Sequence, residues 1–144
     1  MVIGSVRRAI DGERVRAAVE EAERKTSGEI VVAIARYFWG DVERAARRAF
    51  HRLGVARTTG RNGVLLFVVP SRHRFVVLGD IGIHARVGQR FWDVTAAAMS
   101  QCFRAGDLTG GILRGVETIG AQLAAQFPRR RDDVNELPDR PVFA

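Results

Sequence analysis

Two apolar runs stand on either side of a short polar link in Val64-Leu-Leu-Phe-Val-Val69, Pro70-Ser-Arg-His-Arg74 and Phe75-Val-Val-Leu78. Both runs are short and rich in β-branched residues, which is typical of buried strands. The link has the length of a hairpin connection, and Gly79-Asp80 follows the second run as a turn signal. The stretch therefore predicts two antiparallel strands that end at a Gly-Asp turn.

A strand and a helix are expected before this hairpin. The run Ile30-Val-Val-Ala-Ile-Ala35 is too short for a helix and apolar throughout, as in a strand that is covered on both faces. From Val42 to Leu53 the apolar residues recur at helical spacing, and Gly54 follows as a C-terminal stop. A crossover helix between two strands of one sheet makes those strands parallel.

The chain is expected to become helical after Asp80. A short turn over residues 82–87 precedes a predicted helix from about Phe91 to Phe103. Asp107 is placed to cap a last helix, whose apolar stripe ends at Phe127.

A first helix capped by Asp11 completes the predicted order of helix, strand, helix, strand, strand, helix, helix. This order predicts an α/β fold, a three-layer αβα sandwich whose small mixed sheet has two parallel strands plus an antiparallel hairpin partner, with helices on both faces. Residues 1–127 are assigned to this domain. Residues 128–144 form a Pro- and charge-rich tail, expected to be an extended strap or disordered.

The formal net charge of +7 lies entirely on residues 1–127, because acidic and basic residues balance in the tail. The basic residues are almost all arginine and are scattered through every segment, without a basic stripe interleaved with exposed aromatics. We therefore expect no nucleic-acid partner. The single cysteine, Cys102, excludes an intramolecular disulfide.

The N-terminal residues lack the apolar core of a signal peptide. No apolar run approaches the roughly 18 residues that a membrane-spanning helix needs. We therefore expect a cytoplasmic protein without a transmembrane segment.

Oxygen-bearing side chains are expected to gather at one end of the sheet. Two parallel strands and a returning third place Glu29, Asn62 and Asp80 at the same end, and Asp107 is expected to reach it from its loop. Such a cluster would suit a hard cation, calcium or magnesium. Each residue also has a structural interpretation: an ion pair for Glu29, turns for Asn62 and Asp80, and a helix cap for Asp107. His84 lies close to Asp80 in the sequence and is a further candidate.

The chain resembles the TPM domain family, which includes the Psb32/MOLO-1 and thylakoid-lumen phosphatase-like proteins, over about residues 10–127. The order and spacing of four pieces carry this resemblance: Thr26-Ser-Gly-Glu-Ile30, Asn62-Gly-Val-Leu-Leu66, Gly79-Asp80 with Gly82, and Phe103-Arg-Ala-Gly-Asp107 with Gly110-Gly-Ile112. The resemblance implies an αβα sandwich. It also implies a role in the maintenance of membrane proteins, including photosystem II repair, and some members are described as acid phosphatases or as calcium binders.

One residue departs from the family pattern. The family often has an Asp before the Asn-Gly of the second strand, and this chain has Arg61 there. A guanidinium at that position would pair with Asp80 or Glu29 and take the electrostatic role of a cation. The metal candidates of this end of the sheet are therefore Glu29, Asn62, Asp80 and Asp107, and the departure at Arg61 implies that its guanidinium replaces the cation.

Three functions stay open from the sequence. The one we favour is a non-catalytic interaction or binding module, with a protein or membrane-associated complex as its partner, linked to membrane-protein or complex maintenance. The alternatives are an acid phosphatase-like phosphomonoester hydrolase that uses Asp80, Asp107 and His84, with or without a metal, and a calcium-binding regulator.

Overall fold

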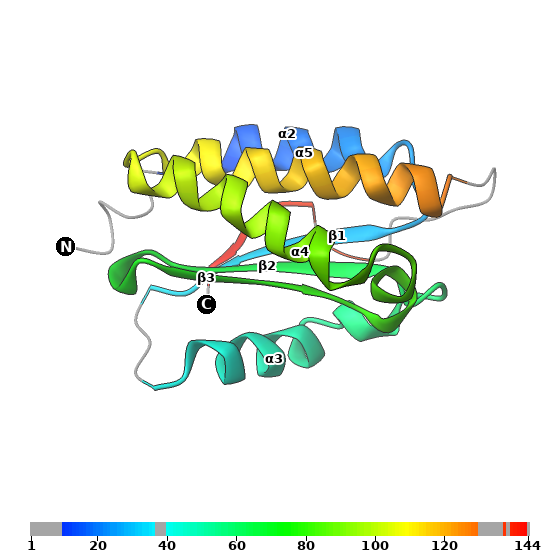
Figure 1. Cartoon of the computed structure of the whole chain (residues 1–144), viewed down its shortest axis with the longest axis horizontal. Helices are drawn as coiled ribbons and strands as arrows, with labels where there is room; N and C mark the ends of the chain where they lie inside the picture. The colour runs from blue at the N-terminus through cyan, green and yellow to red at the C-terminus, as the bar shows by residue number, and fades with distance from the viewer. Residues whose placement is uncertain (1–9, 37–39, 130–136, 138, 144) are drawn as a thin grey trace.

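A computed structural model describes residues 10–36, 40–129, 137 and 139–143. It is a three-layer sandwich, in which helices α2, α4 and α5 cover one face of a mixed sheet and helix α3 covers the other (Figure 1). The elements are α2 (Gly12–Glu23), β1 (Glu29–Ile34), α3 (Val42–Arg52), β2 (Gly63–Val69), β3 (Arg74–Gly79), α4 (Ile81–Arg104), α5 (Leu108–Gln126) and β4 (Val142–Phe143), with short 3-10 turns at Val55–Arg57 and Pro70–Arg72. The predicted fold class is confirmed.

The central strands pair as the sequence predicts. β1 and β2 are parallel, in a register that sets Glu29 opposite Gly63. β2 and β3 form the antiparallel hairpin, with Val64 opposite Gly79 and Val69 opposite Arg74. Every residue of β1 and β2 is buried, because helices cover both faces of these two strands.

A fourth strand comes from the C-terminal segment. β4 pairs in parallel with β1, with Val142 opposite Ala33 and Phe143 opposite Ile34, so the strand order is β3-β2-β1-β4. The sequence predicts only three strands, since two residues are too few to show a strand period. β4 pairs with backbone groups of β1 that would otherwise form a sheet edge. The predicted domain boundary at residue 127 stays a prediction.

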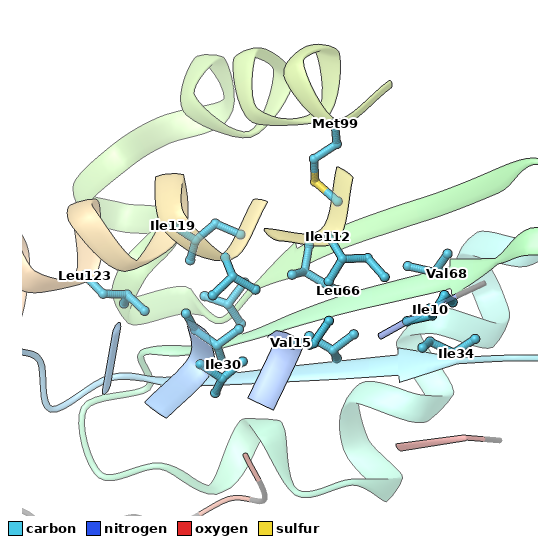
Figure 2. Packing of buried hydrophobic residues seen from close by; sticks show 14 of the residues in the cluster. Ile10, Val15, Ile30, Ile34, Leu66, Val68, Met99, Ile112, Ile119 and Leu123 are labelled. Atoms are coloured by element: carbon cyan, nitrogen blue, oxygen red, sulfur yellow. The ribbon is translucent and has the colours of Figure 1, made fainter. Parts of the chain in front are cut away.

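The larger of the two cores lies between the sheet and α2, α4 and α5 (Figure 2). Alternate residues of β1 and β2 point into it, and the helices contribute apolar stripes from the opposite side. Each fully buried branched side chain stabilises the fold by about 1.5–3 kcal/mol relative to an exposed one. The fully buried members include Val15, Ile30, Ile34, Leu66, Met99, Ile112, Ile119 and Leu123.

Helix α4 begins earlier than the sequence predicts. The expected turn over residues 82–87 is helical, and the interruption falls at Gly88, whose φ of 75° and ψ of 172° break the helix geometry. The helix starts at Ile81 because the Asp80 carboxylate accepts a hydrogen bond from the Ile81 backbone N–H. No helix among the described residues is long and apolar enough to cross a bilayer.

Candidate functional site

The strand ends predicted to converge do converge. The register places Glu29 beside Gly63, and the Asp80 backbone N–H donates to the Gly63 carbonyl at 2.9 Å. The turn before β2 and the start of α4 therefore meet at the end of the sheet where β3 finishes (Figure 1). We call the residues Arg61, Asn62 and Asp80 at this end the rim.

Arg61 and Asp80 form a two-point ion pair at the rim. Arg61 Nε donates to Asp80 Oδ2 at 2.6 Å, and Arg61 Nη2 donates to Asp80 Oδ1 at 2.8 Å. The Asp80 side chain is 4% exposed, whereas that of Arg61 is 45% exposed. The hydrogen bonds to Asp80 raise the pKa of the Arg61 guanidinium above its ordinary value. Of the two partners that the sequence offers for Arg61, Asp80 or Glu29, the structure shows Asp80.

The backbone around Arg61 is shaped for this contact. Arg61 has a φ of 49°, in the left-handed region, and its carbonyl accepts from the backbone N–H of Gly82 at 2.8 Å and of Ile83 at 3.3 Å. A Cβ on Gly82 would lie 2.2 Å from the Gly60 carbonyl oxygen. Only glycine allows the first turn of α4 to approach this loop so closely. Backbone and side-chain hydrogen bonds therefore connect the turn that contains Arg61 to the first turn of α4.

Asn62 is buried next to the Arg61–Asp80 pair, and its hydrogen bonds stabilise the turn before β2. Its backbone N–H donates to Thr58 Oγ1 at 3.1 Å, and its Nδ2 donates to Ser27 Oγ at 3.4 Å. Its Oδ1 is buried without a hydrogen-bond partner among the described residues. Asn62 thus links the start of β2 to the segment that leads into β1.

The carboxyl group of Glu29 lies with a different set of residues. Glu29 is buried, and its carboxyl group lies beside that of Glu23 at the end of α2, as does the carboxyl group of Asp139 from the C-terminal segment. Burial, aided by the hydrogen bond between Glu23 and Asp139 and by the charge of Glu29, raises the pKa of Glu23 to about 10, although the Ile30 backbone N–H opposes the shift. We call Glu23, Glu29 and Asp139 the carboxyl trio.

Asp107 does not reach the rim. It caps α5, where its Oδ1 accepts from the Gly110 backbone N–H at 2.8 Å. The adjacent Leu108 lines a cavity with Val69 and Arg74 of the hairpin, so Asp107 lies at the opposite end of the sheet. Helix α4 carries the chain from the rim to that end (Figure 1). The expectation that Asp107 joins Asp80 is therefore corrected.

His84 faces Trp92 within α4. The Trp92 Nε1–H donates to His84 Nδ1 at 3.0 Å, and the His84 backbone N–H donates to the Asp80 carbonyl at 2.9 Å. As an acceptor, Nδ1 carries no proton in this arrangement. Trp92 lies over Gly79, where a Cβ would come within 2.2 Å of the indole. His84 thus fixes Trp92 against the end of β3.

These placements do not fit a calcium or magnesium ion at the rim. Both oxygens of Asp80 already accept hydrogen bonds from Arg61, and Oδ1 also accepts from the Ile81 N–H. Asp107 lies elsewhere, and within the described residues no three Asp, Glu, His or Cys side chains are grouped so as to hold a metal ion. A guanidinium beside the carboxylate would also repel a cation. What the rim holds is an ion pair in which the guanidinium is 45% exposed and the carboxylate is buried.

The carboxyl trio is the main feature that sequence reasoning missed. A signal for it was present, because Glu23 continues the buried stripe of Val15 and Val19 at four-residue spacing, where a carboxylate is unexpected. Its partners come from a strand and from the C-terminal segment, and no local pattern connects them.

Comparison with solved structures finds two informative relatives. The NMR structure of the BA42 protein from the psychrophilic bacterium Bizionia argentinensis is 36% identical, with a TM-score of 0.86 and coverage of 92% of each chain. The solution NMR structure of the N-terminal domain of the cg2496 protein from Corynebacterium glutamicum is 21% identical, with a TM-score of 0.58 and coverage of 77% of this chain and 70% of that one, and shows a shared fold. A comparison with curated proteins finds no match.

The profile of the TPM domain matches residues 9–122, most of the sandwich. The match includes Asn62, whose side chain is buried, and Gly82, where the close approach of the Gly60 carbonyl described above requires glycine. This chain therefore belongs to the TPM domain family.

Proposed function

We propose that this chain is a non-catalytic binding module that docks through the exposed face of α3 on an acidic surface of a partner protein. Because TPM-domain proteins are associated with the maintenance of membrane proteins, we place the partner in a membrane-protein or other multi-subunit complex. The observation that carries the proposal is a stripe of exposed arginines on α3 that form no ion pair within the described residues. We call Arg44, Arg47, Arg48 and Arg52 the α3 arginine face.

The α3 arginine face follows from the amphipathic sequence of the helix. Val42, Ala45, Ala46, Ala49 and Phe50 are buried against the sheet, and the four arginines on the outer side are all exposed. Spacings of three, four and eight residues place these arginines along one side of the helix. Among the described residues, α3 is the main helix on this face of the sheet (Figure 1), beside the short 3-10 turn at Val55–Arg57, so its outer side forms much of the surface there.

A contrast with α2 supports a binding role for this face. In α2, Arg16 pairs with Glu13 and Glu20, and Arg24 pairs with Glu21. Within the part of the chain that the structure describes, no ion pair involves an arginine of α3. Val42–Arg52 has four arginines against one glutamate, a net charge of +3. The N–H groups of these guanidiniums can therefore donate to carboxylates of a partner, each carboxylate through two parallel hydrogen bonds.

The composition of the face favours an acidic protein over an anionic bilayer. No exposed residue of α3 is apolar, so the helix has nothing to insert between acyl chains. Asp41 and Glu43 lie at the start of the same helix and would be repelled by anionic headgroups. A patch that carries both signs of charge instead suits a protein surface with the complementary charge pattern, which fixes the orientation in which the two proteins dock.

Fluorescence anisotropy with a labelled poly-glutamate peptide tests the proposal. The double variant Arg44→Glu/Arg48→Glu is compared with Arg90→Glu/Arg114→Glu, which makes the same change of net charge on exposed residues of α4 and α5. We expect the α3 variant to bind at least about tenfold more weakly than wild type, with a small effect of the control variant. Vesicles of phosphatidylglycerol and phosphatidylcholine form a second arm.

Each outcome has a defined meaning. Equal losses in the two double variants would show that net charge alone drives binding, which would overturn the docking face. Binding to vesicles but not to the peptide, with loss in the α3 variant, would make lipid the partner and would overturn the protein-partner proposal.

A further inference from the structure

A cavity of about 370 Å³ lies at the end of the sheet opposite the rim. It is enclosed by the β2–β3 hairpin on one side and by the C-terminal part of α4 and the start of α5 on the other. Small-molecule sites in proteins are mostly apolar hollows of roughly 300–1,000 Å³ with a few placed polar groups. The volume is therefore that of a site for a small ligand.

The inner wall of the cavity is apolar and built from both sides. Phe75 of β3 meets Phe103 of α4 in an edge-to-face contact, with ring centroids 5.0 Å apart and an interplanar angle of 73°. Val69 and Leu108 extend this wall from the hairpin and from α5. Phe103 itself is backed by Gly111, where a Cβ would come within 2.3 Å of the ring. The packing therefore fixes the aromatic surface before any ligand arrives.

The residues around the mouth are basic. Arg74 follows the hairpin turn and Arg104 ends α4, and both are exposed while lining the cavity. No ion pair within the described residues involves either arginine. His73 lies between the turn and Arg74 with a φ of 52°, and its backbone N–H donates to the Pro70 carbonyl at 3.1 Å. Two guanidinium groups and one imidazole thus line an apolar hollow.

We propose that this cavity binds an anionic amphiphile, a molecule with a carboxylate or phosphomonoester head on a single acyl or aryl body. The guanidinium groups of Arg74 and Arg104 hold the head by charge-assisted hydrogen bonds. The body lies against Phe75 and Phe103, where burial of apolar surface supplies the remaining affinity. This site is separate from the α3 arginine face, so either proposal can fail without the other.

Isothermal titration calorimetry with four probes tests the ligand class, each probe below its critical micelle concentration. Decanoate and decyl phosphate carry both features, decyltrimethylammonium carries only the apolar body, and inorganic phosphate carries only the anion. We expect one site per chain for the two anionic amphiphiles and at least about tenfold weaker binding of the other two probes. Comparison of decanoate with decyl phosphate shows which head the arginines prefer.

Three variants locate the site. Arg74→Gln/Arg104→Gln removes two exposed charges and should weaken both anionic amphiphiles about tenfold or more. Ser100→Phe, which fills the cavity from α4 without a change of charge, should abolish binding. The matched control Arg90→Gln/Arg114→Gln should bind as wild type does, and thermal melts establish that each variant is folded.

Four results would overturn the proposal. They are absence of binding by both anionic amphiphiles, equal binding of the cationic amphiphile, binding of inorganic phosphate as strong as that of decyl phosphate, or equal losses in the arginine pair and the control pair. Retained binding in folded Ser100→Phe would place the ligand elsewhere and would count equally against it.

Discussion

Arg61 and Asp80, 19 positions apart in the sequence, meet in two parallel hydrogen bonds of 2.6 and 2.8 Å at the end of the sheet. One residue belongs to the turn before β2, and the other caps α4 after β3. The pair therefore links the segment that leads into β2 with the segment that follows β3, and neither residue belongs to a strand. It also neutralises a buried carboxylate with a positive charge that the chain itself supplies.

Asp80 should show a graded response to substitution. Asp80→Asn keeps an oxygen for the Ile81 N–H but loses the charge, and we expect a loss of about 1–2 kcal/mol in the free energy of unfolding. Asp80→Ala also loses the helix cap and should cost about 1 kcal/mol more. Urea unfolding measures both. Asp107→Ala, which removes an exposed cap at the opposite end, should cost less than Asp80→Ala, and the reverse order would contradict the role assigned to Asp80.

Gly82 should tolerate no side chain. Gly82→Ala would drive a Cβ to within 2.2 Å of the Gly60 carbonyl oxygen and 2.6 Å of the Arg61 carbonyl oxygen, so the loop or the helix must move. We expect a loss of about 1–3 kcal/mol in urea unfolding. Gly12→Ala is the matched control, because nothing lies within 4 Å of its Cβ position at the start of α2. Equal stability of the two variants would contradict the close contact.

The carboxyl trio predicts a pH dependence of stability. Because the pKa of Glu23 is raised to about 10 in the folded chain, the native state binds more protons than the unfolded state from about pH 4.3 upward. The contribution of Glu23 to stability is therefore complete below the unfolded pKa, and it falls by up to about 1.4 kcal/mol per pH unit as pH rises toward the folded pKa.

Glu23→Gln should remove this contribution. Its free energy of unfolding should fall less steeply than that of wild type between pH 5 and pH 9, measured by urea unfolding at a series of pH values. Glu21→Gln is the control, since Glu21 is exposed and pairs with Arg24 and Lys25. A wild-type slope that persists in Glu23→Gln would show that Glu23 does not hold the extra proton.

The binding-module proposal predicts no phosphatase activity from the rim. Purified wild type, Asp80→Asn and Asp107→Asn should hydrolyse p-nitrophenyl phosphate at the same background rate, because Asp80 is engaged by Arg61 and Asp107 lies at the other end of the sheet. The assay is run with and without magnesium or calcium. Turnover by wild type that either substitution abolishes would favour the hydrolase instead.

The fold was predictable because its signals are local. The cap at Asp11, the apolar run of β1, the stripe of α3 and the hairpin each occupy one short segment, and chirality rules then arrange them. The same reasoning brought Arg61 to Asp80, since both flank the hairpin directly. The start of the helix at Ile81 was not predicted, because an Asp that follows a strand is compatible with a simple turn as well as with a helix cap.

The contents of the site were less predictable because they depend on distant segments. The position of Asp107 depends on the length of α4, and a helix that begins at Ile81 carries the chain to the opposite end of the sheet. The partners of Glu23 come from β1 and from the C-terminal segment, and β4 has only two residues. Such contacts arise from tertiary packing and leave no periodic pattern in the sequence.

The hypothesis that Arg61 takes the place of a cation is tested most directly by thermal melting of wild type and Arg61→Asp with and without millimolar calcium. We expect the wild-type midpoint to be unaffected by calcium, and that of Arg61→Asp to be lower without calcium and to rise when calcium is added, because a bound ion stabilises the folded state. Arg57→Asp serves as the control for charge alone. A calcium-dependent rise in wild type, or none in Arg61→Asp, would contradict the account.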